Sequence, residues 1–526
     1  MINSKNAAIQ TFNDDKTGIM EMYMNKKVLL IDFYSEGSLG LRYIQNALEH
    51  SGYTVKIVFM KKYDNIFPEK ITQAEHNLLK DFIKSEQPML IGISLITSFY
   101  LELVEEITNY IKEFKIPLVG GGIFATLSPE VCIKYADYIV RGEGEDAICE
   151  LADALANGSP VSGIMNLAYR DENNNVCINE MRPLLANVDK YGFPRVDTGA
   201  EYLINNDTLT KGEPLKNKFA FTIIGTRGCM FSCSFCGSSN LKKLTQGLGS
   251  YVRKRTVKSV IDELVYVKKR LKNLVYVRFA DGIFPYDKEW VDEFAKEYKS
   301  KINLPFKIWT HPLRTNPDII NTLLSAGLHK VVMGIQSGSP YVRNEIFQRK
   351  ESNESIIKAS EIYGKCKVPQ VEYDLILCHP FETVETIKET YELCQSMHGT
   401  FMLNINGLKF MPETPIVDIA IKHGKATYEE IHDSIFQPID KQFEFLRLVE
   451  NSRDTSPDIN FWYMLIYICQ FKFIRKFAKK IQNNPSKYAN RLKKLYFITQ
   501  KLRKLNRYKH LAAMLFKGIF FKKRGL

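Results

Sequence analysis

The chain has 526 residues, of which 45% are hydrophobic and 25% are charged. That length exceeds one ordinary core and predicts two or three domains, and the composition excludes a largely disordered chain. The net charge of +13 is unevenly placed, because residues 470–526 contain 18 Lys or Arg and no Asp or Glu. The rest of the chain holds 54 of the 72 basic residues against all 59 acidic residues, a net charge of −5, so the basic character belongs to the tail.

The cysteines and the amino terminus indicate an intracellular protein. Three of the ten cysteines lie within residues 229–236, and the others are scattered without a pairing rhythm, which argues against a disulfide scaffold. Residues 1–25, expected to be a flexible segment, lack the basic stretch and following apolar run of a secretion signal. We therefore expect a cytoplasmic protein.

Residues 26–160 alternate buried-type strands with amphipathic helices, beginning with the strand KVLLIDF and the helical stretch LRYIQNALEH. This pattern predicts an α/β fold, a Rossmann-like doubly wound parallel sheet. In such a sheet, ligands bind beyond the carboxyl ends of the strands. Residues 161–215 predict a linker, with a small hairpin followed by a connection rich in Pro, Gly and Asn.

Residues 216–425 resume the alternation with six predicted strands, the first of them in FAFTII. Parallel strands separated by helices favour a partial or full β/α barrel. Residues 426–526 predict a helical, basic carboxy-terminal region, whose longest apolar run is too short to span a membrane.

Cys229, Cys233 and Cys236 form a C-x3-C-x2-C group directly after the first barrel strand. A structural zinc site wants four protein ligands, and no fourth stands nearby. An iron–sulfur cube held by three thiolates keeps one iron open for a small molecule. The alternatives are a zinc knuckle and thiols without a shared function. The lack of a fourth ligand nearby argues against the zinc knuckle.

The cysteine spacing, with the aromatic Phe235 before the third thiol, resembles the cluster motif of the radical S-adenosylmethionine (radical SAM) enzymes. The resemblance implies a [4Fe-4S] cluster whose open iron binds the methionine part of SAM. An electron from the cluster then cleaves SAM and yields a 5′-deoxyadenosyl radical.

Further segments resemble the barrel motifs of this family. Asp281 in FADGIF and the segment GIQSGS, with Gly334, Gln336 and Ser337, look like the strand ends that help to hold SAM. Gln336 stands where Glu is usual. In LILCHPFET, Cys378 and Phe381 replace two common glycines, which leaves the geometry of that turn open.

The first domain resembles the cobalamin-binding domain of one large radical SAM class. The resemblance rests on IGISLITS, VGGGIFATLSPE and VRGEGED, and it implies cofactor contacts at a set of polar and glycine positions: Ser94, Thr97, Gly120, Gly121, Gly122 and Glu143. In DFYSEG, Tyr34 stands where some cobalamin proteins place a cobalt-binding histidine, so we expect cobalamin without a protein His ligand. A scaffold domain that no longer binds cobalamin is the alternative.

The resemblance implies a cobalamin-dependent C-methyltransferase. It takes a hydrogen from an unactivated carbon of a small metabolite, lipid precursor or peptide, and methylcobalamin supplies the methyl group. The rival is a radical rearrangement, ring contraction or oxidative cyclisation. A methylthiotransferase is disfavoured because the sequence has no second three-cysteine group, and a non-catalytic cluster and cobalamin sensor is a further alternative. An electron donor such as flavodoxin or ferredoxin is expected.

Two further groups of residues have open roles. His311, His379, Arg314 and Tyr373 fall at predicted strand ends, where either acid–base chemistry or a structural hydrogen bond is expected. In the tail, an apolar face is flanked by basic residues and contains Leu492, Leu495, Thr499 and Leu502. It predicts a cap on the barrel, a contact with an anionic membrane or an attraction for an anionic substrate. No nucleic acid partner is expected.

Overall fold

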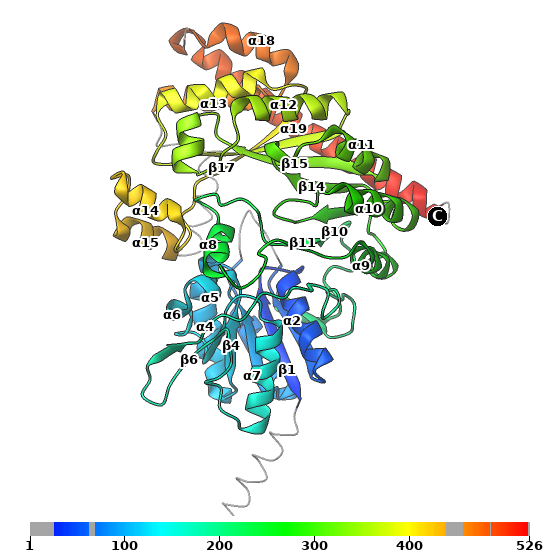
Figure 1. The fold of residues 1–526 in the computed structure, drawn as a ribbon, viewed down its shortest axis with the longest axis vertical. Coiled ribbons are helices and arrows are strands. Elements are labelled where there is room, and N and C mark those ends of the chain that lie inside the picture. Colours follow the sequence, from blue (N-terminus) through cyan, green and yellow to red (C-terminus); the bar gives the residue numbers. More distant parts are fainter. Residues whose placement is uncertain (1–25, 63–68, 438–455, 484, 524–526) are drawn as a thin grey trace, which may run out of the picture. The chain divides into compact units, whose positions relative to one another are not determined.

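The computed structural model describes residues 26–62, 69–437, 456–483 and 485–523 (Figure 1). Contacts divide the chain into two compact units. The first comprises residues 1–185, 190–215 and 247–249, and the second comprises residues 186–189, 216–246 and 250–526. The predicted flexible segment 1–25 lies outside the described residues.

The first unit is built on a nine-stranded sheet with a parallel centre. The strand order is β7-β6-β5-β4-β3-β1-β2-β8-β9, and the five central strands are parallel to one another. These strands are β1 (Lys27–Phe33), β2 (Thr54–Met60), β3 (Leu90–Ser94), β4 (Leu118–Gly121) and β5 (Tyr138–Val140). The prediction of a doubly wound sheet is confirmed, and the order reverses between β1 and β3, where such sheets bind ligands.

Helices connect these strands and cover the sheet. Helices α2 and α7 pack against each other, as do α3 and α4 (Figure 1). The side chain of Thr72 caps α3 by accepting from the N–H of Glu75, whose own carboxylate accepts from the Thr72 N–H. The helical elements are α2 (Leu39–His50), α3 (Gln73–Glu86), η1 (Ser98–Tyr100), α4 (Leu101–Ile111), η2 (Lys112–Phe114), α5 (Ile123–Leu127), α6 (Pro129–Cys132) and α7 (Glu145–Asn157).

Antiparallel hairpins complete both edges of this sheet. The predicted hairpin is confirmed as β6 (Leu167–Arg170) and β7 (Val176–Ile178), which extends the sheet beyond β5. The predicted connection after it is wrong in part. Its residues form β8 (Glu201–Asn205), parallel to β2, and β9 (Thr208–Lys211), antiparallel to β8.

A buried ion pair explains why β8 and the residues after β9 join the core. The Arg42 side chain, 1% exposed, lies 2.9 Å from the carboxylate of Glu213 and 3.6 Å from that of Glu201. Both carboxylates are fully buried, and besides the one guanidinium each accepts two backbone N–H hydrogen bonds inside the unit. The Arg42 guanidinium also lies over the Phe59 ring, 5.3 Å from its centre.

The second unit contains a six-stranded parallel sheet in the order β10-β13-β14-β15-β16-β17. This linear order makes it a partial barrel, one of the two predicted forms. The strands are β10 (Ala220–Ile223), β13 (Tyr276–Phe279), β14 (Phe306–Thr310), β15 (Leu328–Gln336), β16 (Gln370–Leu377) and β17 (Met402–Gly407). A short ribbon, β11 (Thr226–Arg227) and β12 (Arg253–Lys254), follows β10.

Helices follow the strands around the outside of the partial barrel, each packed against the next from α9 to α13 (Figure 1). Aromatic rings fill the space between β13, β14 and α10; Phe279, Phe294 and Phe306 meet edge to face at 5.5 to 5.8 Å. The helical elements are α8 (Gly237–Leu244), α9 (Val257–Arg270), α10 (Lys288–Lys301), η3 (Pro312–Arg314), α11 (Pro317–Ala326), η4 (Val342–Ile346), α12 (Asn353–Lys365) and α13 (Val384–Ser396).

The carboxy-terminal region is helical, as predicted, and its elements are α14 (Pro415–Lys422), α15 (Tyr428–Phe436), α17 (Pro457–Ile468), α18 (Lys472–Ile481) and α19 (Pro485–Lys523). Helix α17 packs on α13 of the barrel, and both α18 and α19 pack on α17. On α19, Leu492 and Thr499 are buried, whereas Leu502 is 38% exposed, so the packed stripe is narrower than predicted. Within the described residues, none of the helices has the length and apolar character needed to cross a bilayer.

Candidate functional site

Three thiols lie on the loop that follows the first strand of the partial barrel. Cys229, Cys233 and Cys236 are partly buried, and none of them is in a disulfide. Burial raises the pKa of the Cys233 thiol to about 11; the charge of Arg349 opposes this rise, and the neighbouring thiols add to it. The three sulfur atoms are therefore close enough to feel one another's charge, as the ligands of one centre must be.

The arrangement of these thiols bears on the kind of metal centre that they could hold. Within the part of the chain that the structure describes, no three His, Cys, Asp or Glu side chains form a group that could hold one ion. An iron–sulfur cube instead presents separate iron corners to separate thiolates. A set of three thiols without a fourth ligand fits such a cluster with one open iron. Cys236 stands at the amino terminus of α8, where the N–H groups of Ser238 and Ser239 favour the thiolate, but burial outweighs them and raises the pKa of this thiol.

Asp281 holds the start of the cysteine loop. Its Oδ1 atom accepts hydrogen bonds from the N–H of Gly225 at 2.8 Å, the N–H of Thr226 at 2.6 Å and the hydroxyl of Thr226 at 2.7 Å. Burial raises the pKa of Asp281 to about 6, although these hydrogen bonds oppose the rise. The sequence predicts a contact between Asp281 and SAM. In the structure the carboxylate, 3% exposed, fixes the loop that carries the thiols.

Gly228 brings the backbone of the loop against a neighbouring segment. Its φ is +85°, and a Cβ atom added there would lie 2.1 Å from the carbonyl oxygen of Tyr251. The Tyr251 hydroxyl in turn donates to the carbonyl of Ser238 in α8. No side chain fits at residue 228, so glycine is required immediately before Cys229.

A buried charged network adjoins the second thiol. The Nη1 atom of Arg349 lies 3.8 Å from the Sγ of Cys233, and its Nη2 donates to the carbonyl of Gly334 at 2.8 Å. Its Nε donates to Glu351 at 2.5 Å. Burial alone would raise the pKa of Glu351, but the hydrogen bond from His311 and the charge of Arg349 outweigh it and lower this pKa to about 2. Glu351 is therefore ionised and neutralises the guanidinium.

His311 completes this network. The N–H of Leu313 donates to Nδ1 of His311 at 3.2 Å, so the neutral ring carries its proton on Nε2, which lies 3.4 Å from Glu351. Burial lowers the pKa of His311, which keeps the ring neutral. The ring stacks on Phe231 of the cysteine loop with centroids 3.6 Å apart. The predicted structural hydrogen bond at this strand end is thus present.

The segment from Gly334 to Ser337 lies at the end of β15. Gln336 has a φ of +58°, beside an irregularity in the pairing with β16, and its buried Oε1 has no hydrogen-bond partner within the described residues. The hydroxyl of Ser337 instead lies 3.3 Å from that of Thr390 and accepts from the N–H of Ser339. Gln336 thus keeps an acceptor for a ligand, whereas the Ser337 hydroxyl is used within the protein.

A second polar cluster lies at the end of β16. Cys378 keeps a left-handed backbone, with φ +55°, although it replaces a glycine of the family pattern. Its N–H donates to Glu382 at 2.8 Å and to the hydroxyl oxygen of Tyr463 at 3.1 Å, and this hydroxyl donates to the same carboxylate. Burial raises the pKa of Glu382 to about 7 and lowers the pKa of His379 to about 3.

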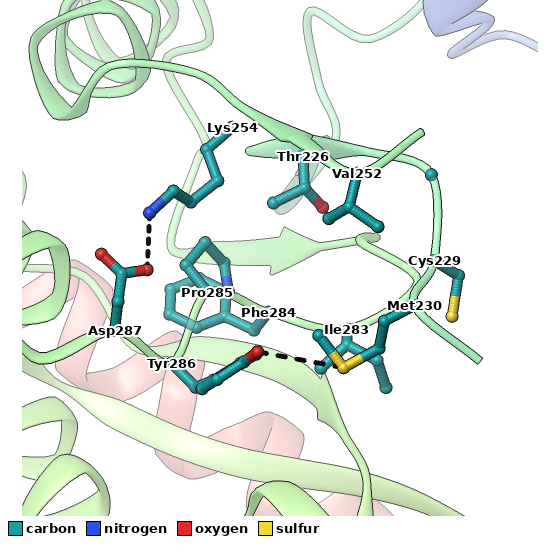
Figure 2. A pocket seen from close by; sticks show the side chains of 11 residues that line it. Thr226, Cys229, Met230, Val252, Lys254, Ile283, Phe284, Pro285, Tyr286 and Asp287 are labelled. Carbon is teal, nitrogen blue, oxygen red and sulfur yellow. Dashed lines mark hydrogen bonds and ion pairs between the residues drawn. The ribbon is translucent and has the colours of Figure 1, made fainter. Parts of the chain in front are cut away.

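A pocket with a volume of about 260 Å³ opens beside Cys229 (Figure 2). Met230 and Tyr286 meet at one side of the pocket, and Lys254 pairs with Asp287 at 2.7 Å at another. Outside the side chains drawn, Arg314 donates to the Met230 sulfur at 3.3 Å and lies over the Tyr286 ring. The pocket is thus mainly apolar and aromatic, which suits a small organic group.

Phe235 and Tyr373 differ in their placement. Phe235 is partly buried and meets Phe347 edge to face at 5.1 Å, next to the second and third thiols in sequence. Tyr373 was expected at a strand end facing the site, but this prediction is wrong. It lies within β16, 1% exposed, and packs on Phe401. Alternation along β16 turns its ring into the core rather than toward the strand ends.

In the first unit, a buried carboxyl lies at the carboxyl ends of β1 and β3. Asp32 is 2% exposed, and burial raises its pKa to about 6, a rise that the nearby hydroxyls of Ser38 and Ser94 oppose. The predicted residue Ser94 therefore lies near this carboxyl, whose Oδ1 accepts from the N–H of Phe33 at 3.0 Å. The hydroxyl oxygen of Thr97 accepts from the N–H of Phe99 and caps η1. These polar groups lie where the strand order reverses.

Tyr34 occupies the place of the absent histidine. It is 5% exposed, its hydroxyl donates to the carbonyl of Glu69 at 2.5 Å, and its ring lies 5.2 Å from that of Tyr100. Its side chain is therefore engaged within the unit, and this position offers no imidazole to a metal.

The predicted glycines serve packing as well as any ligand. A Cβ atom at Gly120 would lie 2.6 Å from the Leu95 side chain, and one at Gly122, whose φ is +129°, would lie 2.8 Å from the Leu95 carbonyl oxygen. At Gly121 the nearest atom would be at an ordinary 3.6 Å. The Glu143 carboxylate accepts from the N–H of Leu185 at 2.8 Å and so holds the chain after the hairpin.

Arg349, Glu351 and Tyr463 were not predicted from the sequence. Arg349 and Glu351 lie in the polar stretch QRKE, whose charges are typical of a solvated loop. Tyr463 lies in the apolar stretch FWYMLIY, which is typical of a core helix. Arg349 and Glu351 pair with each other, but the groups that give the three residues a place in the site, Cys233, His311 and Cys378, lie far away in the sequence, so no local signal marks them.

Known families account for both units. Residues 223–394 match the Radical SAM superfamily, and residues 27–152 match the B12 binding domain. Together they decide the classification. The chain belongs to the radical SAM enzymes with a cobalamin-binding domain. This cobalamin-dependent radical SAM enzyme therefore uses a [4Fe-4S] cluster, SAM and cobalamin, in line with the three free thiols of the cysteine loop.

Named relatives of this radical SAM enzyme differ in reaction. It is 28% identical over 387 residues to an uncharacterised methyltransferase of Pyrococcus horikoshii, covering 72% of this chain and 76% of the relative. It is 26% identical over 377 residues to the anaerobic magnesium-protoporphyrin IX monomethyl ester cyclase of Cereibacter sphaeroides, covering 67% of this chain but only 55% of the cyclase.

A solved structure shares the fold of this radical SAM enzyme. The radical S-adenosylmethionine methyltransferase TsrM of Kitasatospora setae, with cobalamin and a [4Fe-4S] cluster bound, superposes with a TM-score of 0.61. The match covers 76% of this chain and 75% of TsrM at 18% sequence identity, so it establishes the similarity of fold.

Proposed function

We propose that this enzyme is a C-methyltransferase that acts on an unactivated carbon of a small molecule. The observation that carries the proposal is the joining of a cobalamin-binding unit and a three-thiol radical SAM unit in one chain, without a second cluster motif. The methyltransferase name of the Pyrococcus horikoshii relative supports it, since the alignment covers most of both chains.

The bound cofactors supply a radical that removes a hydrogen atom and a methyl group that replaces it. The chain's own residues hold and shield them. The thiolates of Cys229, Cys233 and Cys236 would hold the cluster, and Asp281 would fix their loop. The unpartnered Oε1 of Gln336 at the end of β15 would accept a hydrogen bond from SAM. These roles rest on the placement of the residues at strand ends.

The apolar and aromatic lining of the pocket beside Cys229 supports a small organic group, rather than a highly charged one, as its occupant. The one cation among the described lining residues, Lys254, is paired with Asp287 at 2.7 Å, which leaves it less available to an anionic group.

A radical cyclisation without methyl transfer is the second candidate, favoured by the cyclase relatives. The two reactions differ in the mass of the product and in what SAM becomes. Methylation uses one SAM as methyl donor and one as radical source, so S-adenosylhomocysteine and 5′-deoxyadenosine accumulate together. Cyclisation removes hydrogen from the substrate and leaves the methyl group of SAM in place.

The test uses full-length protein reconstituted anaerobically with iron, sulfide and hydroxocobalamin. It is incubated with reductant, SAM carrying a trideuterated methyl group, and a small-molecule extract of the cells in which the protein naturally occurs. We expect a compound in which one hydrogen is replaced by the labelled methyl group, and equal amounts of the two SAM products. A compound that has lost hydrogen and carries no label would instead establish the cyclase. The Cys229→Ala, Cys233→Ala, Cys236→Ala triple variant controls for non-enzymatic SAM decay.

A further inference from the structure

Helix α18 presents exposed phenylalanines at the edge of its apolar side. Ile474, Ala478 and Ile481 are buried, whereas Phe473 is 73% exposed and Phe477 is 40% exposed. Residues four apart lie on the same side of a helix, so the two exposed rings are neighbours. The apolar side of the helix is thus wider than the part that the protein covers, and the two rings form its uncovered edge.

Arg475 fixes the orientation of this helix. Its Nη2 donates to the carbonyl of Gly399 at 2.5 Å, its Nε donates to the carbonyl of Cys469 at 2.8 Å, and its guanidinium lies 4.6 Å from the centre of the Phe401 ring. This buried anchor prevents a simple rotation that would hide Phe473 and Phe477. Their exposure is therefore a property of the docked helix.

Helix α19 also leaves apolar residues uncovered. Leu492 and Thr499 are buried, and the opposite side carries exposed apolar residues: Phe497 at 52%, Ile498 at 54% and Leu505 at 61%. At 100° per residue, Lys494 and Lys501 fall among these three, on the side away from Leu492. Aromatic and aliphatic groups are thus interleaved with ammonium groups on the uncovered face.

The charge around these faces has one sign. Residues 470–526 contain 18 Lys or Arg and no Asp or Glu, and on α18 the lysines Lys476 and Lys480 flank the exposed rings. Within the described residues, no ion pair joins Lys476, Lys480, Lys494 or Lys501 to a carboxylate. The exposed surface of α18 and α19 is therefore both cationic and apolar.

We propose that the exposed faces of α18 and α19 dock this enzyme on an anionic phospholipid bilayer. An interfacial helix places aromatic and aliphatic side chains at the boundary of the acyl chains, while lysines meet lipid phosphates. A nucleic acid would also attract the lysines, but it offers no apolar medium for Ile498, Leu505 and the phenylalanines. The apolar residues thus decide for the bilayer. This surface is separate from the cofactor-binding residues and does not depend on the proposed reaction.

The test is co-sedimentation of the full-length protein with vesicles of pure phosphatidylcholine or of phosphatidylcholine mixed with phosphatidylglycerol. We expect binding to the anionic vesicles alone, weakened as the salt concentration rises. The Phe473→Ser, Phe477→Ser variant should bind at least about tenfold more weakly. The matched control is Tyr428→Ser, which removes an aromatic residue 64% exposed on α15, outside the docking faces; it should bind as wild type does.

Charge is tested in parallel. Lys476→Glu, Lys480→Glu should weaken binding to anionic vesicles, whereas Lys422→Glu, Lys425→Glu, at and just after the end of α14 and outside the docking faces, should not. Iron content and the unfolding midpoint of each variant show that it remains folded. Equal binding to neutral vesicles, no binding to either kind, or displacement from vesicles by DNA with no effect of the phenylalanine substitutions would overturn the proposal.

Discussion

The guanidinium of Arg349 lies 3.8 Å from the sulfur of Cys233 and is held there by Glu351 at 2.5 Å. A cation beside a ligand sulfur favours the thiolate over the thiol. The carboxylate behind the guanidinium prevents it from being a buried, unpaired charge. The pair thus places one positive group at one corner of the cluster site and keeps the local net charge near zero.

Arg349→Gln should destabilise the protein because it leaves the ionised Glu351 buried with His311 as its remaining partner. Breaking a buried ion pair in this way costs about 3 to 5 kcal/mol. The free energy of unfolding of the apoprotein, from denaturant titration, measures this cost. The double variant Arg349→Gln, Glu351→Gln should recover most of it. If the single variant is as stable as the double, the pair carries no such energy.

Two substitutions of Asp281 distinguish the role of its negative charge from the role of its hydrogen bonds. Asp281→Leu leaves the N–H groups of Gly225 and Thr226 without their acceptor, at about 1 to 3 kcal/mol each, and should lose iron. Asp281→Asn keeps an acceptor oxygen and should retain more iron. Iron per chain after reconstitution and desalting measures the effect; equal retention by both variants would contradict the assigned role.

Gly228→Ala should prevent the cysteine loop from adopting its conformation, and the protein should lose its iron, because the added Cβ would lie 2.1 Å from the carbonyl oxygen of Tyr251. Gly247→Ala is the matched control, since its φ of +84° is nearly the same but nothing lies within 4 Å. The control should cost about 1 kcal/mol and keep its iron. Iron loss in both variants would assign the defect to backbone strain rather than to the close approach.

Glu382 should make stability depend on pH. Its pKa is raised from 4.5 to about 7 in the folded state, chiefly by burial. The stabilisation is therefore fully present below pH 4.5 and is lost as the pH rises through about 7, by up to about 3 kcal/mol. Glu382→Gln cannot titrate and should flatten this slope. Unfolding curves from pH 5 to pH 8 measure it, and parallel slopes would refute the assignment.

Much of the fold could be predicted because parallel strands buried on both faces are continuous apolar runs, as in KVLLIDF and LIGIS. Strand β8 could not, because its short apolar run, Tyr202 to Ile204, stands among Gly, Asp and Asn residues, a composition that favours turns. What made this segment a strand was its pairing with β2 and the buried contact of Glu201 with Arg42, both of them distant in sequence.

The thiols of the candidate site could be predicted because the spacing of Cys229, Cys233 and Cys236 is a local property of the chain. The residues around them depend on tertiary contacts. Arg349 reaches Cys233 across 116 residues, and Tyr463 reaches Cys378 across 85. The glycines at 120 and 122 had a visible signal, but it does not show whether a ligand or Leu95 occupies the space above them.

The buried ion pairs of Arg42 have a consequence for folding while the chain is being synthesised. Arg42 is made early, but both of its carboxylate partners, Glu201 and Glu213, belong to the segment that closes the far edge of the sheet. A nascent chain that has reached residue 160 contains strands β1 to β5, and the edge of the sheet at β2 is still unpaired. Its Arg42 side chain has neither of the two carboxylates with which it forms buried ion pairs in the complete protein. We expect the amino-terminal unit to wait on the ribosome in an aggregation-prone form until residue 213 emerges.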